Sequence, residues 1–377
     1  MKIMEPFQIK GVSFQNRVVM APMVPFGLEE SEGGAMSGEV LRHYLDRSAN
    51  PMGLMISQSL SVTGDVPTSG AVGAYEDAHQ AHLRRLAEAC HIKGVRFFAQ
   101  LAYPGAGFPQ KPDINAYQAD DIERIQGEFI RAAKICKDSG CDGVELHGAH
   151  GFFLNKMASP TANRRTDRFG GSLSGRLRLA EGIAAGIRAF SDERFILSYR
   201  MGWNDSLKSD VQTAQALEAM GIELLHISSG IPNNRVIEHP ADFPYNDIVY
   251  TGVFLKPYLN IPVTVVNGIG TLNRGNALVE KGLSDFVAYG KPFLADEAFL
   301  TRSLIDPDHT ACLNCDNCRW FSNGKKCPAQ IRVRKARQGG INYEKNGIHR
   351  ARASGRFCVM TSARVLYPKR NTCSGRR

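Results

Sequence analysis

Residues 143–200 read GVELHGAHGFFLNKMASPTANRRTDRFGGSLSGRLRLAEGIAAGIRAFSDERFILSYR. This stretch begins with one short apolar run, Gly143–His147, and ends with another, Phe195–Arg200. The segment Gly175–Phe190 between them has the pattern of an amphipathic helix. A strand, a helix and a second strand in this order are typical of a parallel sheet whose strands are joined by crossover helices.

The same alternation continues in both directions along the chain. Six further apolar runs are predicted as strands, at Arg17–Ala21, Gly53–Ser57, Arg96–Leu101, Leu224–Ser228, Val263–Asn267 and Asp285–Tyr289. Helices are predicted most clearly at Val40–Arg47, Glu76–Ile92, Asp120–Asp138, Val211–Met220, Leu272–Lys281 and Ala295–Leu304, in addition to Gly175–Phe190. Eight such units indicate an α/β fold and favour a closed (β/α)8 TIM barrel over an open sheet.

The net charge of +9 is concentrated at the C-terminal end of the sequence. Residues 328–377 contain thirteen Lys or Arg and one acidic residue, whereas residues 1–327 contain 33 basic and 36 acidic residues. Because the net charge of residues 1–327 is close to zero, there is no electrostatic reason to expect nucleic acid in the main cleft of this part of the protein. We predict a barrel over residues 1–310, a cysteine-rich loop over 311–328 and a basic, flexible tail over 329–377. Contact of this tail with nucleic acid, an anionic surface or the phosphate of NADPH stays open.

The first residues, MKIMEPFQIKG, lack the apolar segment of a secretory signal peptide. No later stretch has the apolar length that spans a bilayer. We therefore expect a cytoplasmic protein without membrane contact, whose nine cysteines are reduced, buried or metal-bound rather than paired in disulfides. The sequence leaves the oligomeric state open, a homo-oligomer included.

Polar residues at the ends of the predicted strands are the first candidates for a site, because the chemistry of an α/β barrel lies at the carboxyl ends of its strands. These residues are Gln58, Ser59, Gln100, His147, Arg200 and Ser228. Each alone is compatible with a satisfied buried polar group. Six of them on one face of the barrel favour an active site.

Two glycine-containing loops follow the seventh and eighth predicted strands. Gly268 and Gly270 lie in VTVVNGIGT, and Gly290 precedes Lys291 in DFVAYGKPFLAD. Barrels bind phosphate at this position through backbone N–H groups, and lysine adds a point charge. Turns that merely need glycine are the alternative interpretation.

His147 and His150 lie three residues apart just after a predicted strand. This spacing allows both imidazoles to donate hydrogen bonds to an oxygen or anion in one cleft. A metal site and a purely structural pair are the alternatives, although no third nitrogen or oxygen ligand stands out nearby.

The HGAHG, SP and NRRTDRFGGS segments of residues 147–172 carry a family resemblance, together with PFQIKGVSFQNRVVMAPM near the start and YGKPFLADE at residues 289–297. On these motifs the chain resembles the Old Yellow Enzyme group of NADH:flavin oxidoreductases, which are FMN-containing (β/α)8 barrels. The resemblance implies an enzyme in which NAD(P)H reduces FMN. Hydride then passes from flavin N5 to an electron-poor carbon–carbon double bond of the enone or enoate type.

The resemblance also implies a role for individual residues. Pro22, Met23 and Val24 would lie along the isoalloxazine, Gln100 at its pyrimidine edge and Arg200 near N1 and O2. The FMN phosphate would be held by Gly268, Gly290 and Lys291, and the carbonyl of the substrate would accept hydrogen bonds from His147 and His150. A cation near N1 fits the chemistry, since hydride arriving at N5 places negative charge there.

Three positions depart from the family pattern. Phe152 stands where most relatives have the tyrosine that protonates the substrate, so Tyr103, Tyr75 or solvent is left as the proton donor. Val24 replaces a threonine or cysteine that tunes the flavin potential, and a different potential is expected. Lys291 replaces the usual arginine, which should weaken phosphate binding modestly.

Cys312, Cys315, Cys318 and Cys327 follow the predicted barrel in a C-x2-C-x2-C-x8-C pattern. Four thiolates this close together suit a [4Fe–4S] cluster or a tetrahedral zinc ion, with metal-free thiols as the third interpretation. The loop resembles, imperfectly, the cluster loop of the 2,4-dienoyl-CoA reductase branch of the family. Two other functions stay open: a flavin-dependent dehydrogenase or demethylase, and an electron-transfer or nucleic-acid-binding component that uses the cysteines and the tail.

Overall fold

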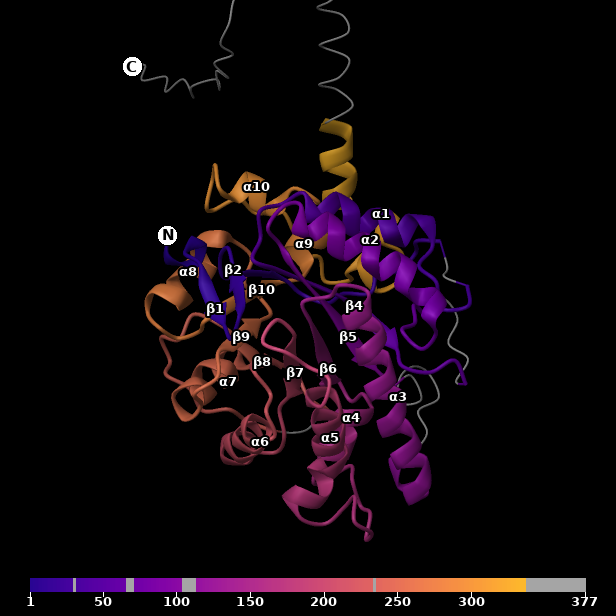
Figure 1. Ribbon diagram of the computed structural model, residues 1–377. Coiled ribbons are helices and arrows are strands. Elements are labelled where there is room, and N and C mark those ends of the chain that lie inside the picture. The colour runs from indigo at the N-terminus through magenta and orange to yellow at the C-terminus, as the bar shows by residue number, and fades with distance from the viewer. Residues whose placement is uncertain (30–31, 66–70, 104–112, 233–234, 337–377) are drawn as a thin grey trace, which may run out of the picture. The chain divides into compact units, whose positions relative to one another are not determined.

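Eight parallel strands close into a barrel in the order β10-β3-β4-β5-β6-β7-β8-β9. Figure 1 labels the barrel strands from β4 to β10. The computed structural model describes residues 1–29, 32–65, 71–103, 113–232 and 235–336. The barrel strands are β3 (Val18–Met20), β4 (Leu54–Ser61), β5 (Arg96–Ala102), β6 (Gly143–Gly148), β7 (Ile196–Gly202), β8 (Leu224–Ser228), β9 (Val263–Val266) and β10 (Phe286–Tyr289). All eight predicted strands are present, and the predicted TIM-barrel fold is confirmed.

The helices that follow the strands form a layer around the barrel in Figure 1. They are α1 (Gly38–Ser48), α2 (Gln80–His91), α3 (Ala119–Asp138), α4 (Phe153–Ala158), α5 (Leu173–Arg188), α6 (Leu207–Ala219), α7 (Asp247–Leu255), α8 (Leu272–Glu280), α9 (Lys291–Ala295) and α10 (Phe299–Ser303). Several begin at a side-chain cap that accepts a backbone N–H of the first turn, which stabilises the helix start at that residue. These caps are Ser37, Ser172, Ser206, Asn246 and Thr271. The prediction did not contain α4, α7 or α9, and α10 is shorter than predicted.

A hairpin that the sequence analysis did not predict packs against the apolar part of the barrel interior. Strands β1 (Phe7–Ile9) and β2 (Val12–Phe14) pair antiparallel. The Phe14 ring packs edge-on against Phe98 and Phe286, with centroid distances of 6.2 and 5.3 Å. Strands of three residues are too short to show a periodicity, which is why the pattern of apolar residues did not reveal them.

The four-cysteine segment packs on the barrel and belongs to the same compact unit, residues 1–331. The Trp320 ring is buried and lies 5.8 Å from the His43 ring. The Gly324 N–H donates to the Phe26 carbonyl at 2.7 Å, and Lys325 pairs with Glu39 at 2.7 Å. The segment is therefore attached to the loop between β3 and α1. Residues 337–377, which make up most of the predicted tail, lie outside the described residues.

Among the described residues, no helix is both long enough and apolar enough to cross a bilayer.

Candidate active site

A cavity of about 630 Å³ lies at the carboxyl ends of the barrel strands. Its wall contains ten residues that the sequence analysis assigned to cofactor or substrate binding. They are Pro22, Met23, Val24, Gln100, His147, His150, Arg200, Gly268, Gly290 and Lys291. The volume is within the range of small-molecule sites in proteins. The structure thus brings together residues from six strand ends that are far apart in the sequence.

Arg200 on β7 supplies a buried cation to this cavity. Its side chain is 5% exposed, and its Nη2 donates to the Ser228 hydroxyl at 3.2 Å. Burial lowers the pKa of the guanidinium to about 10, although the charge of Glu145 opposes this shift. The group therefore stays protonated at neutral pH. Its Nε has no hydrogen-bond partner among the described residues, so a donor is available to a ligand.

His147 and His150 meet at the end of β6. Their rings lie 5.1 Å apart and nearly perpendicular, and His150 Nε2 is 2.7 Å from the Ser228 hydroxyl. The Phe152 ring packs on His147 with a centroid distance of 4.4 Å. His147 Nδ1 has no partner within the described part of the chain. The pair can therefore present imidazole nitrogens to a ligand at the mouth of the barrel.

Burial keeps both imidazoles neutral. The pKa of His147 is well below its ordinary value, first because of burial and then because His150 and the charged Arg200 lie close to it. Burial and the Arg200 charge lower the pKa of His150 to about 2. A neutral imidazole still carries one N–H, so each ring can donate a hydrogen bond without carrying a charge.

The backbone of the cavity wall has an unusual conformation at three points. Outside glycine, positive φ is found among the described residues at Lys10, His150, Asn267 and Asn314, and the last three of these line the cavity. Such residues cost conformational energy and gather at functional sites. At the end of β9, Asn267 and Gly268 follow one another with φ of 94° and 68°, so the loop turns sharply at the cavity.

The donors of this cavity fit FMN. A flavin ring requires polar groups such as the Arg200 Nε, which has no partner among the described residues, and the Gln100 amide. A phosphate requires groups such as the two glycine turns and Lys291. A Cβ added at Gly290 would lie only 3.2 Å from the Met23 sulfur. A side chain at this position would therefore crowd the cavity wall between the predicted flavin-ring site and the predicted phosphate site.

Comparison with known families decides the relationship that the motifs indicated. Residues 2–116 and 110–305 match the model of the NADH:flavin oxidoreductase / NADH oxidase family. The chain belongs to this family. The resemblance inferred from the HGAHG and NRRTDRFGGS segments is thereby confirmed.

Individual relatives of the NADH:flavin oxidoreductase family agree with this assignment. The chain is 30% identical over 321 residues to an NADH oxidase from Thermoanaerobacter brockii. The alignment covers 77% of this chain and 48% of the relative. It is 29% identical over 316 residues to an NADPH dehydrogenase from Geobacillus sp. (strain WCH70). This alignment covers 78% of this chain and 90% of the relative. The old yellow enzyme homologue from Zymomonas mobilis shares the fold, with a TM-score of 0.69 at 20% identity, over 87% of this chain and 99% of that chain. This chain thus spans about half the length of the NADH oxidase.

The cavity also contains residues that the sequence analysis did not assign to it. Cys312, Asn314 and Phe321 reach its wall from the four-cysteine segment, and Phe26 comes from the loop after β3. The rings of Phe26 and Phe321 are 45% and 64% exposed. No pattern in the sequence shows that a segment beyond the barrel returns to the barrel mouth.

The structure does not support an iron–sulfur cluster or a zinc ion at the four cysteines, two of the three interpretations that the sequence left open. Cys312, Cys315, Cys318 and Cys327 line one small cavity of about 20 Å³. Even so, the described residues contain no group of three or more His, Cys, Asp or Glu side chains arranged to hold a metal ion.

The two tyrosines that the sequence offered as proton donors pack against other aromatic rings and not against the cavity. Tyr103 is 3% exposed and packs edge-on against Phe153 and Tyr117, with ring centroids 5.0 and 6.4 Å away. Tyr75 packs on His79 at 4.5 Å. Neither is among the described residues that line the cavity.

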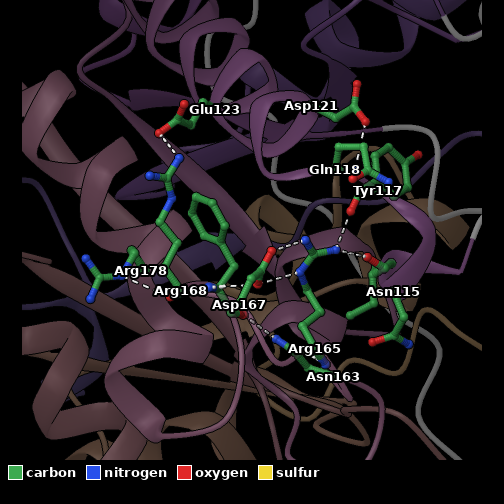
Figure 2. A network of polar contacts seen from close by, with 12 residues as sticks. Asn115, Tyr117, Gln118, Asp121, Glu123, Asn163, Arg165, Asp167, Arg168 and Arg178 are labelled. Carbon is green, nitrogen blue, oxygen red and sulfur yellow. Dashed lines mark hydrogen bonds and ion pairs between the residues drawn. The ribbon is translucent and has the colours of Figure 1, made fainter.

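The NRRTDRFGGS segment, residues 163–172, does not line the cavity and contributes to the polar network of Figure 2. Arg165 donates from Nη1 to the carbonyls of Ile114 and Tyr117, at 2.9 and 2.6 Å, and pairs with Asp167. Arg168 pairs with Glu123 of α3, as Figure 2 also shows. The motif therefore attaches the segment before α3 to the segment before α5, and its role is structural.

Replacing Arg165 with alanine should lower the free energy of unfolding by about 2–3 kcal/mol, because two backbone carbonyls and a carboxylate lose their shared donor. Urea denaturation followed by circular dichroism measures this change. Arg164→Ala is the matched control, since the Arg164 side chain is 71% exposed and should contribute less than about 1 kcal/mol. Equal losses in the two variants would contradict the structural role of Arg165.

Stability should fall as the pH decreases from 7.5 to 5.5. The pKa values of His43, His82, His147 and His150 are all lowered by burial. Below about pH 6.5 the unfolded chain therefore binds protons that the folded chain does not. Each of these histidines then lowers the free energy of unfolding by about 1 kcal/mol as the pH falls by one unit. Thermal melting at the two pH values checks this. The variant His147→Asn/His150→Asn should show a weaker dependence, and an unchanged melting temperature in the wild-type protein would contradict the prediction.

Proposed function

We propose that the protein is an FMN-dependent NAD(P)H oxidoreductase that reduces an activated carbon–carbon double bond of the enone or enoate type. The observation that carries this proposal is one cavity in which the buried cation of Arg200 lies close to two neutral imidazoles, His147 and His150. Two glycine turns and Lys291 line the same cavity. Membership of a flavin oxidoreductase family supports the cofactor and the hydride donor.

The residues of the cavity divide into those that would hold FMN and those that would bind the alkene. Gln100 and Arg200 would hold the pyrimidine edge of the ring, and Gly268, Gly290 and Lys291 the phosphate. When bound, FMN supplies a hydride that it has taken from NAD(P)H. The fixed positive charge of Arg200 stabilises the negative charge that develops at this edge.

His147 and His150 would donate hydrogen bonds to the carbonyl oxygen of the alkene. These donors withdraw electron density from the double bond and make its β-carbon a better hydride acceptor. Because both rings are neutral, they polarise the carbonyl without transferring a proton to it. Phe152, which packs on His147, has no proton to give, so water supplies the proton to the α-carbon.

Anaerobic stopped-flow spectroscopy of the FMN-loaded protein tests the proposal. Flavin absorbance should bleach on mixing with NADPH or NADH and return on mixing with 2-cyclohexenone. A protein that binds no FMN would contradict the proposal. So would bleaching by a saturated or amine substrate but not by NAD(P)H, which is the result expected of a flavin-dependent dehydrogenase.

The aromatic residues at the cavity rim should select alkenes with an apolar substituent. Phe321→Ala should raise KM about tenfold for an alkene with a phenyl substituent and leave KM for a methyl-substituted one unchanged, because only the larger substituent reaches the exposed ring. Steady-state kinetics with the two substrates measure this. Tyr258→Ala is the control, since this tyrosine is 47% exposed and is not part of the described cavity wall. Equal changes in KM for both substrates would contradict the prediction.

A further inference from the structure

A chain of buried polar side chains crosses the barrel interior next to the candidate site. Gln100 on β5 donates from Nε2 to Glu145 Oε1 on β6 at 2.7 Å. Glu145 Oε2 lies 2.8 Å from Nδ1 of His226 on β8. Glu145 and His226 are fully buried, and Gln100 is 2% exposed. Only Gln100 and the neighbouring Arg200 reach the cavity wall, so Glu145 can act on a ligand only through them.

The geometry and charges of this chain give Glu145 a defined ionisation state. Burial by itself raises the pKa of a carboxyl group, but the contact with His226, the charge of Arg200 and the hydrogen bond from Gln100 outweigh it, and the pKa of Glu145 is lowered. Burial lowers the pKa of His226, so its imidazole is neutral and donates its Nδ1–H to the carboxylate. The negative charge of Glu145 therefore compensates the positive charge of Arg200 inside the barrel.

An ionised carboxylate fixes the orientation of the Gln100 amide. A carboxylate only accepts hydrogen bonds, so it must face the amide nitrogen and not the amide oxygen. Turning the amide over would bring two acceptor oxygens together in a buried, dry environment, which is costly. The amide oxygen of Gln100 is consequently the atom that is left to a ligand in the cavity.

We propose that Glu145 is a positioning residue that holds the Gln100 amide with its oxygen available to an N–H donor of the bound cofactor and balances the charge of Arg200. The inference rests on the proposed function, in which the pyrimidine edge of FMN lies at Gln100. The N3–H of that edge is the donor that matches an amide oxygen. The charge of the Glu145 carboxylate also lowers the positive electrostatic potential that Arg200 creates at that edge.

Binding and redox measurements on three variants test this inference. Glu145→Gln removes the charge and allows either amide orientation, so FMN should bind about tenfold more weakly, which corresponds to one hydrogen bond. Gln100→Ala should weaken binding about as much. Because Glu145 acts on binding through Gln100, the double variant should also lose about tenfold and not a hundredfold. The dissociation constant of FMN is measured by fluorescence quenching.

The midpoint potential of the bound flavin separates the charge from the hydrogen bond. It should become more positive in Glu145→Gln, where Arg200 is no longer compensated, and stay unchanged in Glu145→Asp, which keeps the charge but is too short to hold Gln100. Ser198→Ala is the control, since its buried hydroxyl donates to the Leu224 carbonyl and not to this chain. That variant should change neither the potential nor the affinity.

Two results would overturn the inference. One is a hundredfold loss of affinity in Glu145→Gln/Gln100→Ala, which means that the two residues act independently. The other is wild-type affinity and potential in Glu145→Gln. If Glu145→Gln does not fold, Glu145→Asp decides: wild-type FMN affinity in that variant also rejects the positioning role. Failure of the wild-type protein to bind FMN would instead reject the proposed function, so the two failures are distinguishable.

Discussion

The double variant His147→Ala/His150→Ala should reduce alkenes at least about a thousandfold more slowly than the wild-type protein. Both imidazoles are neutral donors at the barrel mouth, His147 buried and His150 half-buried, and His150 is held by the Ser228 hydroxyl at 2.7 Å. Removing a single donor that stabilises developing negative charge typically costs a factor of 10²–10³. The loss of both should therefore leave the carbonyl of the alkene unpolarised. Single-turnover oxidation of the reduced protein by 2-cyclohexenone measures the effect.

The same variant should be reduced by NAD(P)H within about threefold of the wild-type rate, because in that half-reaction the flavin accepts the hydride and no alkene has to be activated. His239→Ala is the control, since this histidine is not among the described residues that line the cavity. A double variant that reduces cyclohexenone at a near-normal rate would exclude the two histidines as the carbonyl donors. Equal slowing of both half-reactions would instead indicate that the histidines support cofactor binding.

The barrel was predictable because each of its strands lies in a short apolar run, and several of these runs end in a polar residue. His147 and Arg200 illustrate this: each ends such a run, the two are neighbours in the register of β6 and β7, and both line the cavity. Strand ends of a closed barrel converge by geometry, so residues at equivalent positions meet without any local signal of contact. Gly268 and Gly290, for which we propose phosphate binding, line the cavity for the same geometric reason.

Other parts of the site depend on contacts that a single sequence does not show. Glu145 is two residues before His147 and therefore points to the same face of β6, which was a usable signal that a charge enters the barrel. Its partner His226 lies 81 positions away. Phe321 reaches the cavity only because Gly324 and Lys325 attach its segment to the loop after β3 and to α1. Long-range docking of this kind leaves no periodic pattern.

Replacing Arg200 with methionine should weaken FMN binding and slow reduction by NAD(P)H by a factor of about 10²–10³. Arg200 is a buried cation with a free Nε donor at the cavity, and methionine fills much of its volume without charge. The midpoint potential should become more negative, since the charge that hydride transfer adds is no longer stabilised. Stopped-flow reduction and a redox titration measure the two effects. Arg200→Lys should be intermediate, because lysine keeps the charge and loses the fork of donors.

Arg200→Met also leaves the Glu145 carboxylate without its cation, so this variant alone could lose activity through instability. The double variant Arg200→Met/Glu145→Gln removes both charges and should recover the melting temperature. Its potential should stay more negative than that of Glu145→Gln, and its reduction by NAD(P)H should stay slow. Recovery of the reduction rate together with stability would show that Arg200 serves the fold and not the flavin. Slow reduction in a stable protein is the result expected if the guanidinium stabilises the charge that hydride transfer creates.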